Sequence, residues 1–270
     1  MKNLIIELYK FLFLRPCARK LNQLVFQCAA HGLGILNYKT SHDNGEAYLV
    51  NKFLCEYFAG KTDITFFDVG ANVGDYSRLL CDAFPGAKVY AFEPHPDTYN
   101  ELSGHGKSVP YEPVNFGMSE TPGETVIYEK ANNSVSQHNS LYKTVIANSN
   151  EAEPRAVEIN LTSVDAFMQE RGIERIDFLK IDTEGHELSI LKGARKAISK
   201  GQIELVQFEF NEMNLHSHTT MRDLRATLPN YTFYRLSPRG LVLLPDLSLY
   251  QEIYQFNNIL CVPNKRNLPM

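Results

Sequence analysis

The stretch from Phe178 to Glu187, FLKIDTEGHE, changes within a few positions from apolar to strongly acidic. Carboxylate and imidazole side chains are the groups that most often move protons in catalysis. The dipole of a following helix would stabilise acids in its first turn, which accounts for Glu184 or Glu187 on structural grounds alone. It does not account for an acid at the strand end, Asp182, with a glycine and His186 within one turn. The segment is therefore a candidate reaction site.

A second motif, FFDVGANVGDYS, spaces Asp68, Gly70, Asn72 and Gly74 as D-x-G-x-N-x-G. The glycines permit a sharp turn and a close approach of the backbone to a ligand, which the following helix N-terminus would face. The dinucleotide fingerprint requires G-x-G-x-x-G, and Asn72 stands in place of its second glycine. Asp68 is either a turn residue or an acid that attracts an amino group or another cation.

Glu93 ends the next apolar run, VYAFE, and lies 19 residues beyond Gly74. An acid about that far along a strand-helix-strand unit accepts hydrogen bonds from the ribose hydroxyls of a nucleoside. Glu93 therefore predicts a nucleoside ligand, and the structural alternative is an isolated acid on a surface turn.

These residues belong to short apolar runs that alternate with helical patterns. Runs that are apolar on both faces, separated by helices, predict a parallel sheet covered on both sides. We expect a helical N-terminal extension at residues 1–60 and one α/β domain at residues 61–270. Strands are expected at 64–69, 87–93, 114–116, 176–182 and 203–210, and helices at 75–84, 96–102 and 184–199.

The end of the chain and one internal segment depart from this alternation. The sequence predicts a hairpin that turns at Pro238 and Gly240, followed by a last strand, NNILCVP. Residues 129–158 are polar with little apolar periodicity, which is typical of a lid over a site or of a disordered insertion.

Composition narrows the class of protein. The 270 residues are 44% hydrophobic and 21% charged, with a formal net charge of -4 and scattered basic residues, which argues against a nucleic-acid partner. The five cysteines are widely spaced and form no CxxC, as expected for reduced thiols in the cytoplasm.

The N-terminal run MKNLIIELYKFLFLRP is interrupted by Glu7 and Lys10 and is shorter than the roughly 20 residues of a membrane span. We expect no transmembrane segment but a helix with one apolar face. That face would pack on the domain, join a second subunit in an oligomer or touch a membrane surface. It comprises Leu4, Ile5, Leu8, Phe11 and Leu12.

The motifs FFDVGANVGDYS, VYAFEPHP and FLKIDTEGHELSILKGA, with the hairpin FYRLSPRG, resemble the FkbM family of S-adenosylmethionine-dependent methyltransferases. GLGILNY, NGEAYLV and NNILCVP are also similar to that family, so the resemblance extends over nearly all of the chain from about residue 31. It implies a Rossmann-like class I methyltransferase fold, with a seven-stranded, mostly parallel sheet whose last strand is antiparallel.

The resemblance also implies roles for individual residues. The cofactor S-adenosylmethionine would be held by the glycine motif and Glu93, with Ser119 near the adenine and Asp182 facing the reactive methyl group. His138 and Ser140 resemble a serine-bearing loop of the family and are candidate substrate contacts, or an exposed loop.

Methyl transfer to a hydroxyl requires that the hydroxyl proton leave, and a general base contributes about 10² to 10⁴-fold to such a rate. His186 is the candidate base, with substrate contact or a structural role as alternatives. Asp182 would orient it or bind the substrate hydroxyl. Glu209 and Asn211 reach the same edge from the next strand, where an unpaired acid would be costly. Glu184 is a further candidate substrate contact.

Metal catalysis is the competing hypothesis. Asp182 and Glu209, with Glu184 and His186, offer ligands that suit Mg²⁺ or Mn²⁺. The predicted function is O-methylation of a sugar, a glycan or a related polyhydroxylated small molecule. A polyketide or lipid-linked acceptor, or a nucleoside-binding scaffold without catalysis, is the alternative.

Overall fold

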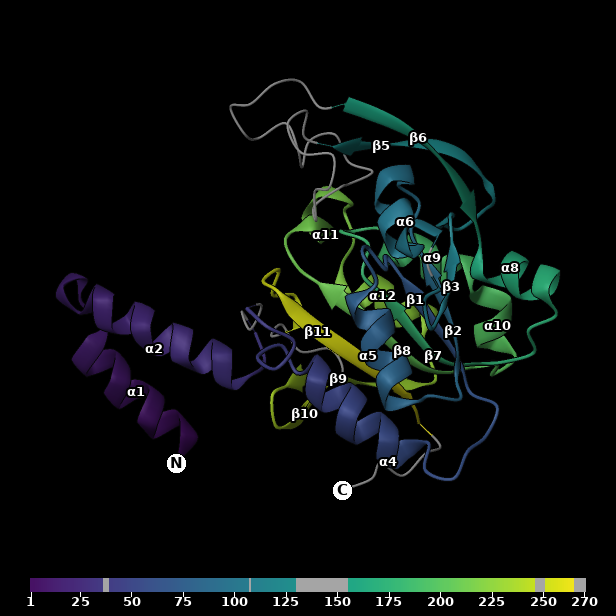
Figure 1. Cartoon of the computed structure of the whole chain (residues 1–270). Helices are drawn as coiled ribbons and strands as arrows, with labels where there is room; N and C mark the ends of the chain where they lie inside the picture. The colour runs from purple at the N-terminus through teal and green to yellow at the C-terminus, as the bar shows by residue number, and fades with distance from the viewer. Residues whose placement is uncertain (36–38, 107, 130–154, 246–250, 265–270) are drawn as a thin grey trace.

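The computed structural model describes residues 1–35, 39–106, 108–129, 155–245 and 251–264. Its centre is a sheet of eight strands in the order β10-β9-β11-β8-β7-β1-β2-β3 (Figure 1). The strands are β1 (Thr65–Val69), β2 (Lys88–Phe92), β3 (Glu112–Val114), β7 (Ile176–Ile181), β8 (Ile203–Phe210), β9 (Tyr231–Ser237), β10 (Gly240–Leu244) and β11 (Asn257–Pro263).

The strand directions confirm the predicted α/β class. Strands β3, β2, β1, β7 and β8 are parallel, and β11 lies antiparallel between β8 and β9. The sheet has eight strands within the described residues, one more than the seven expected. The additional strand is β10, because the predicted hairpin pairs it with β9 at the edge.

The chain runs from β1 outward to β3 and then returns to β7, so the order reverses between β1 and β7. Ligands of open α/β sheets bind at such a point.

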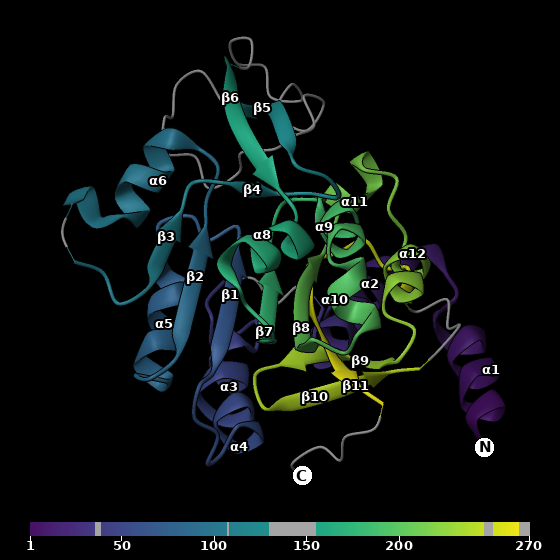
Figure 2. The same ribbon diagram turned by 90° about the vertical axis from the view of Figure 1, so that its right-hand side faces the viewer.

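Apolar side chains on both faces explain why the central strands are buried. All six residues of β7 are buried, as are four of the five in β1. On one face, Phe66 and Phe178 pack with α5 and with the helical segment around Phe53. On the other face, Phe67 and Leu179 pack with α8, α9, α10 and α12. The helices on the two faces are visible in Figure 2. Their bounds are α5 (Asp75–Ala83), α6 (Pro96–Leu102), α8 (Val164–Arg171), α9 (Glu187–Gly193), α10 (Arg195–Ser199), α11 (Met213–His216) and α12 (Met221–Thr227).

Two local expectations are wrong. The helix expected at 184–199 begins only at Glu187, because Glu184 and Gly185 have positive φ angles of 53° and 100°, and it is divided at Ala194. The short strand after β2 is Glu112–Val114 and not 114–116. Of residues 129–158, for which a lid or a disordered insertion was expected, Glu129 ends one strand of a second sheet and 155–158 begin another, while 130–154 lie outside the described residues. That sheet has the order β4-β6-β5, with β4 (Gly117–Met118), β5 (Gly123–Glu129) and β6 (Arg155–Thr162).

The first 60 residues form two different structures. Helix α3 (Glu46–Tyr48), a π-helical turn (Leu49–Leu54) and α4 (Cys55–Tyr57) pack on the sheet, with Leu49 and Phe53 in the core. Helices α1 (Lys2–Phe13) and α2 (Arg19–Gly32) instead project away from the sheet (Figures 1 and 2). Among the described residues, no helix is both long enough and apolar enough to cross a bilayer.

Candidate active site

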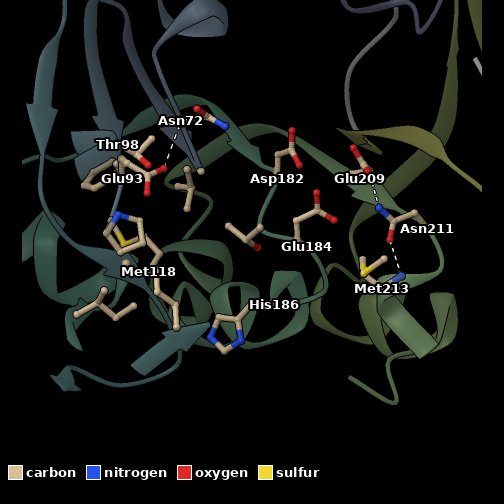
Figure 3. Close-up of a pocket in the computed structure, with 18 of the residues that line it drawn as sticks. Asn72, Glu93, Thr98, Met118, Asp182, Glu184, His186, Glu209, Asn211 and Met213 are labelled. Carbon is tan, nitrogen blue, oxygen red and sulfur yellow. Dashed lines mark hydrogen bonds between the residues drawn. The ribbon is translucent and has the colours of Figure 1, made fainter. Parts of the chain in front are cut away.

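A cavity of about 790 Å³ lies at the carboxyl ends of β1, β2, β7 and β8. Glu93, Thr98 and Met118 stand at one end, and Glu209 and Asn211 at the other (Figure 3). This volume is in the range of about 300 to 1,000 Å³ that is usual for small-molecule sites. The cavity therefore joins the end of β2, where a nucleoside was expected, to the acidic strand ends of β7 and β8.

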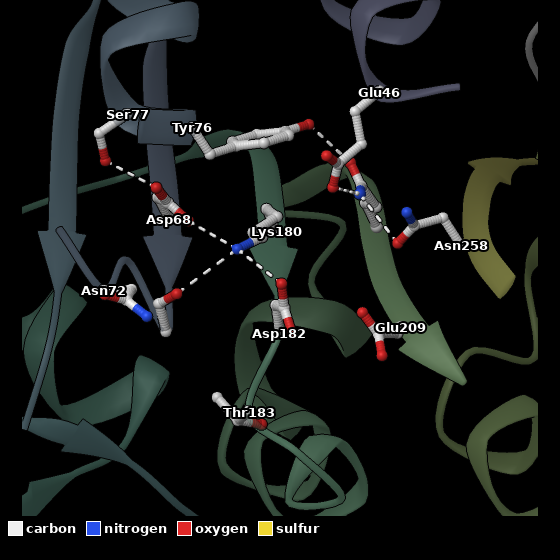
Figure 4. A network of polar contacts seen from close by, with 12 residues as sticks. Glu46, Asp68, Asn72, Tyr76, Ser77, Lys180, Asp182, Thr183, Glu209 and Asn258 are labelled. Carbon is white, nitrogen blue, oxygen red and sulfur yellow. Dashed lines mark hydrogen bonds and ion pairs between the residues drawn. The ribbon is translucent and has the colours of Figure 1, made fainter. Parts of the chain in front are cut away.

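A polar row crosses the sheet directly beneath the cavity. Asp68 on β1 pairs in register with Lys180 on β7, and Lys180 pairs with Gln207 on β8. Side chains two residues apart lie on the same face of a strand, so Asp182 and Glu209 continue this row toward the cavity. Figure 4 shows Asp68, Lys180, Asp182 and Glu209 in this row.

Lys180 forms ion pairs with two carboxylates of the row. Its Nζ lies 3.2 Å from Asp68 Oδ1 and 3.3 Å from Asp182 Oδ2, and 5.2 Å from the centre of the Tyr76 ring. Burial alone would lower the pKa of Lys180, but the carboxylates of Asp182, Asp68 and Glu46 raise it above its ordinary value. The ammonium group therefore stays charged, and sequence reasoning missed it although a lysine inside so apolar a strand requires acidic partners.

Asp68 is fully buried and does not line the cavity. Besides Lys180, its carboxylate accepts a hydrogen bond from Ser77 Oγ at 2.6 Å. Asp68 is thus linked through Lys180 to Asp182, and Asp182 is the carboxylate of the two that lines the cavity.

The glycine motif serves packing as well as the ligand site. A Cβ atom at Gly70 would lie 1.8 Å from the Asp182 carbonyl oxygen, and one at Gly74 would lie 2.4 Å from the Tyr111 hydroxyl oxygen. Both glycines have positive φ, so a side chain would also be strained there. Gly70 and Asn72 line the cavity, whereas Gly74 does not.

Glu93 is buried at the cavity wall. Its carboxylate accepts hydrogen bonds from the backbone N–H groups of His95, at 2.9 Å, and Asn72, at 3.1 Å. Burial raises the pKa of Glu93 to about 7, and the two backbone hydrogen bonds lower it in part. Each carboxylate oxygen has a further lone pair, so Glu93 can still accept hydrogen bonds from a ligand.

The acidic turn after β7 separates into residues with different roles. Glu187 is buried, and its carboxylate accepts hydrogen bonds from the N–H groups of Thr183 and Gly185 and from the Asn214 side chain. Burial raises the pKa of Glu187 to about 7. Glu187 therefore shapes the turn, while Glu184 and His186 line the cavity.

His186 packs beside Ser119 rather than beside an acid. Its Nε2 lies 3.0 Å from Ser119 Oγ, which in turn lies 3.1 Å from Ser189 Oγ. Burial lowers the pKa of His186 to about 4, so the ring is neutral near pH 7. Ser119, expected near the adenine, does not line the cavity and instead contacts this ring.

Glu209 has a raised pKa, first because it is buried and then because Asp182 and Glu184 are near. It accepts a hydrogen bond from the side-chain amide of Asn211, and both residues line the cavity. This end of the cavity therefore brings several carboxyl groups close together.

Three buried polar atoms of cavity residues have no hydrogen-bond partner within the described structure: Asn72 Oδ1, Thr98 Oγ1 and His186 Nδ1. Buried polar atoms are nearly always satisfied, so unpaired atoms on a cavity wall are candidate ligand contacts. Thr98 was missed by sequence reasoning, because a threonine in a helix carries no local signal of a ligand.

Two further expectations concern metal ions and the polar segment. In the parts of the chain that the structure covers, no group of three or more His, Cys, Asp or Glu side chains is arranged to hold a metal ion. His138 and Ser140 lie outside the described residues.

Comparison with known proteins identifies the family. The methyltransferase FkbM domain matches residues 68–234. The hexuronic acid methyltransferase AglP of Haloferax volcanii is 29% identical over 147 residues, which cover 54% of this chain and 56% of that protein. The methyltransferase sdnD of Sordaria araneosa is 30% identical over 158 residues, which cover 47% and 58%. The chain thus spans a little over half the length of these two relatives.

Two more similarities extend over a larger share of the chain. The 2-O-methyltransferase NoeI of Sinorhizobium fredii is 22% identical over 208 residues, which cover 70% of this chain and 82% of that protein. The solved structure of the plantazolicin methyltransferase BpumL in complex with SAH aligns with 96% of this chain and 94% of that one, at 9% identity and a TM-score of 0.45. The FkbM domain covers well over half of the present sequence, and the chain belongs to the FkbM methyltransferase family.

Proposed function

We propose that this chain is an S-adenosylmethionine-dependent O-methyltransferase that acts on a hydroxyl group of a sugar, a glycan or a related polyhydroxylated compound. The observation that carries the proposal is that one cavity has Glu93 at one end and the acidic ends of β7 and β8 at the other. A nucleoside and a hydroxyl-bearing acceptor would meet inside it.

The residues present fit the cofactor. Glu93 would accept the ribose hydroxyls, and the unpaired Asn72 Oδ1 and Thr98 Oγ1 offer polar contacts at the same end. Phe116 and Met118 supply apolar wall for a base. The carboxylate of Asp182 would attract the positively charged methionine portion. When bound, S-adenosylmethionine supplies an electrophilic methyl group.

The residues around the acceptor would handle its proton. His186 is neutral near pH 7 and keeps an unpaired ring nitrogen that can accept the hydroxyl proton, and its lowered pKa makes it a weaker base than an ordinary histidine. Glu209, which is protonated more readily than an ordinary glutamate, and Asn211 would hold neighbouring hydroxyl groups of a polyol. A metal ion bound by Asp182 and Glu209 is the alternative means of lowering the hydroxyl pKa.

The acceptor class is inferred from the site and from relatives. One relative is named a hexuronic acid methyltransferase and another a 2-O-methyltransferase, and both names denote carbohydrate or hydroxyl chemistry. The several carboxyl and amide groups of the cavity suit an acceptor with many hydroxyl groups. The assay must distinguish this proposal from two alternatives: a polyketide or lipid-linked acceptor, and a scaffold without catalysis.

The direct test incubates the protein with radiolabelled S-adenosylmethionine and a panel of uronic acids, neutral sugars, glycolipids and polyketides, with and without EDTA. We expect label in a uronic acid or sugar product, and equal incorporation with EDTA. Label found only in a polyketide or glycolipid would show that the acceptor belongs to that class instead. Loss of activity with EDTA would support the metal alternative. Cofactor binding without transfer to any acceptor would favour the scaffold.

A further inference from the structure

The α1–α2 segment, residues 1–33, exposes most of the large apolar side chains found on the protein surface. Of the 17 exposed large hydrophobic residues in the described chain, 14 lie within this segment. No residue of α1 is buried, and in α2 the one buried residue is Ala30. Large apolar side chains exposed in such number on one segment indicate a site of contact with a protein or a membrane.

The segment is also basic, whereas the rest of the chain is acidic. Residues 1–33 contain five Lys or Arg and one Glu, which leaves 22 basic and 30 acidic residues in the remainder. In the described structure, Lys10 is the one Lys or Arg of the segment with an ion pair, to Glu7. The apolar surface is thus accompanied by four basic side chains that have no acidic partner there: Lys2, Arg15, Arg19 and Lys20.

The turn between the two helices places basic and apolar groups together. Leu14, Pro16 and Phe26 line an open cleft at this turn with Arg15 and Arg19. The Asn22 side chain accepts a hydrogen bond from the Tyr9 hydroxyl and donates one to the Phe13 carbonyl, and so fixes one helix against the other. The segment is therefore a defined hairpin whose outer surface is apolar and cationic.

We propose that the α1–α2 hairpin binds the surface of an anionic lipid bilayer, with its apolar side chains among the acyl chains and its basic side chains at the headgroups. Apolar residues combined with Lys and Arg are the composition of interfacial helices. At about 1.5 Å per residue, the 12 residues of α1 and 14 of α2 measure about 18 and 21 Å. They fit an orientation along the surface better than across a hydrocarbon core of about 30 Å.

Charge favours this occupant over a dimer in which two hairpins pack against each other. Two hairpins with a net charge of +4 each would repel one another in a dimer, whereas an anionic membrane attracts each of them. The proposal is independent of the methyl-transfer reaction, because neither helix contributes a residue to the cavity.

The experiment is flotation of the full chain with vesicles of phosphatidylcholine, or of phosphatidylcholine with phosphatidylglycerol. We expect flotation with the anionic vesicles, which weakens as salt is added, and little flotation with neutral ones. Leu8→Glu should weaken vesicle binding by about tenfold or more, since it places a charge in the apolar face. Arg15→Gln with Arg19→Gln should weaken binding to anionic vesicles alone.

Leu243→Glu is the matched control, because Leu243 on β10 is 56% exposed and Leu8 is 57% exposed. This control variant should float like the wild type. Two results would overturn the proposal: equal flotation of the Leu8→Glu variant and the control, or a dimer in sedimentation velocity that Leu8→Glu dissociates while no vesicle binds. Circular dichroism of each variant checks that the fold is retained.

Discussion

Asp68 and Lys180 are adjacent in the register of β1 and β7, and their ion pair lies beneath the cavity floor. Asp68 is fully buried, so its charge depends on Lys180 for compensation. The same ammonium group contacts Asp182, which lines the cavity. Lys180 therefore couples the stability of the sheet to the charge that a ligand meets.

Lys180→Met should lower the free energy of unfolding by about 3 to 5 kcal/mol, because Asp68 is left buried without a cation. Adding Asp68→Asn should restore much of this loss, since Asn can still accept the Ser77 hydrogen bond. Urea denaturation measures both values. Lys200→Met, at an exposed position, is the control. A Lys180→Met protein as stable as the wild type would show that the ion pair contributes little.

His186→Ala should lower kcat by about 10² to 10⁴-fold while the affinity for S-adenosylmethionine stays nearly unchanged. Because the pKa of His186 is about 4, kcat of the wild type at saturating cofactor should not fall between pH 7.5 and 5.5 on its account. Steady-state kinetics and calorimetry provide the two readouts, with exposed His105→Ala as the control. Full activity of the His186 variant would place the base elsewhere.

At the scale of elements, the turn from β7 to α9 depends on Glu187. Its carboxylate accepts hydrogen bonds from the backbone of Thr183 and Gly185 and from Asn214 in α11, and so joins the turn to that helix. Glu184 and Gly185 hold positive φ angles within that turn. This arrangement delays the helix and directs Glu184 and His186 to the cavity.

Glu187 predicts a specific dependence of stability on pH. Its pKa is about 7 in the folded protein against an ordinary 4.5, so between these values the folded state keeps a proton that the unfolded chain has released. The free energy of unfolding should therefore fall as pH rises from 4.5 to 7, by about 3 kcal/mol from this group.

Glu187→Gln removes that titration, so the stability of the variant relative to the wild type should increase over the same window. Glu187→Ala lacks the hydrogen bonds and should be less stable than Glu187→Gln at every pH. Thermal or urea unfolding at several pH values measures the difference. If the difference in free energy of unfolding between the wild type and Glu187→Gln does not change with pH, the role of the buried carboxyl is contradicted.

Sequence patterns identified the strands that are buried on both faces. The central strands were predictable because parallel strands covered on both faces are apolar throughout. Strands β5 and β6 were missed, although Val157, Ile159 and Leu161 of β6 alternate with polar residues, which is the pattern of a strand with one exposed face. The early start assigned to α9 ignored positive φ at Glu184, which its hydrogen-bonded surroundings impose and its residue type does not signal.

At the scale of the whole molecule, the positions of Asp182, Glu209 and Glu93 around one cavity follow from the strand order, so the sequence could predict them. The partners of each group could not be predicted, because they depend on register across different strands. Lys180, Gln207 and their contacts are the main example. How the first 60 residues pack could not be predicted from the sequence for the same reason. Residues 46–57 pack in the core, while the α1–α2 hairpin stands apart.

The central claim is that Glu93 recognises the nucleoside of S-adenosylmethionine, and calorimetry of cofactor binding at pH 6 and pH 8 tests it most directly. The pKa of Glu93 is about 7, and the charged carboxylate is the better acceptor of two hydroxyl hydrogen bonds. Wild-type affinity should therefore gain up to about tenfold from this group between the two pH values.

Glu93→Gln should bind much more weakly and lose this component of the pH dependence, while exposed Glu124→Gln should behave as the wild type. Because the ligand titrates identically with each protein, the comparison isolates the carboxyl of Glu93. Equal affinity of Glu93→Gln and the wild type at both pH values would contradict the account.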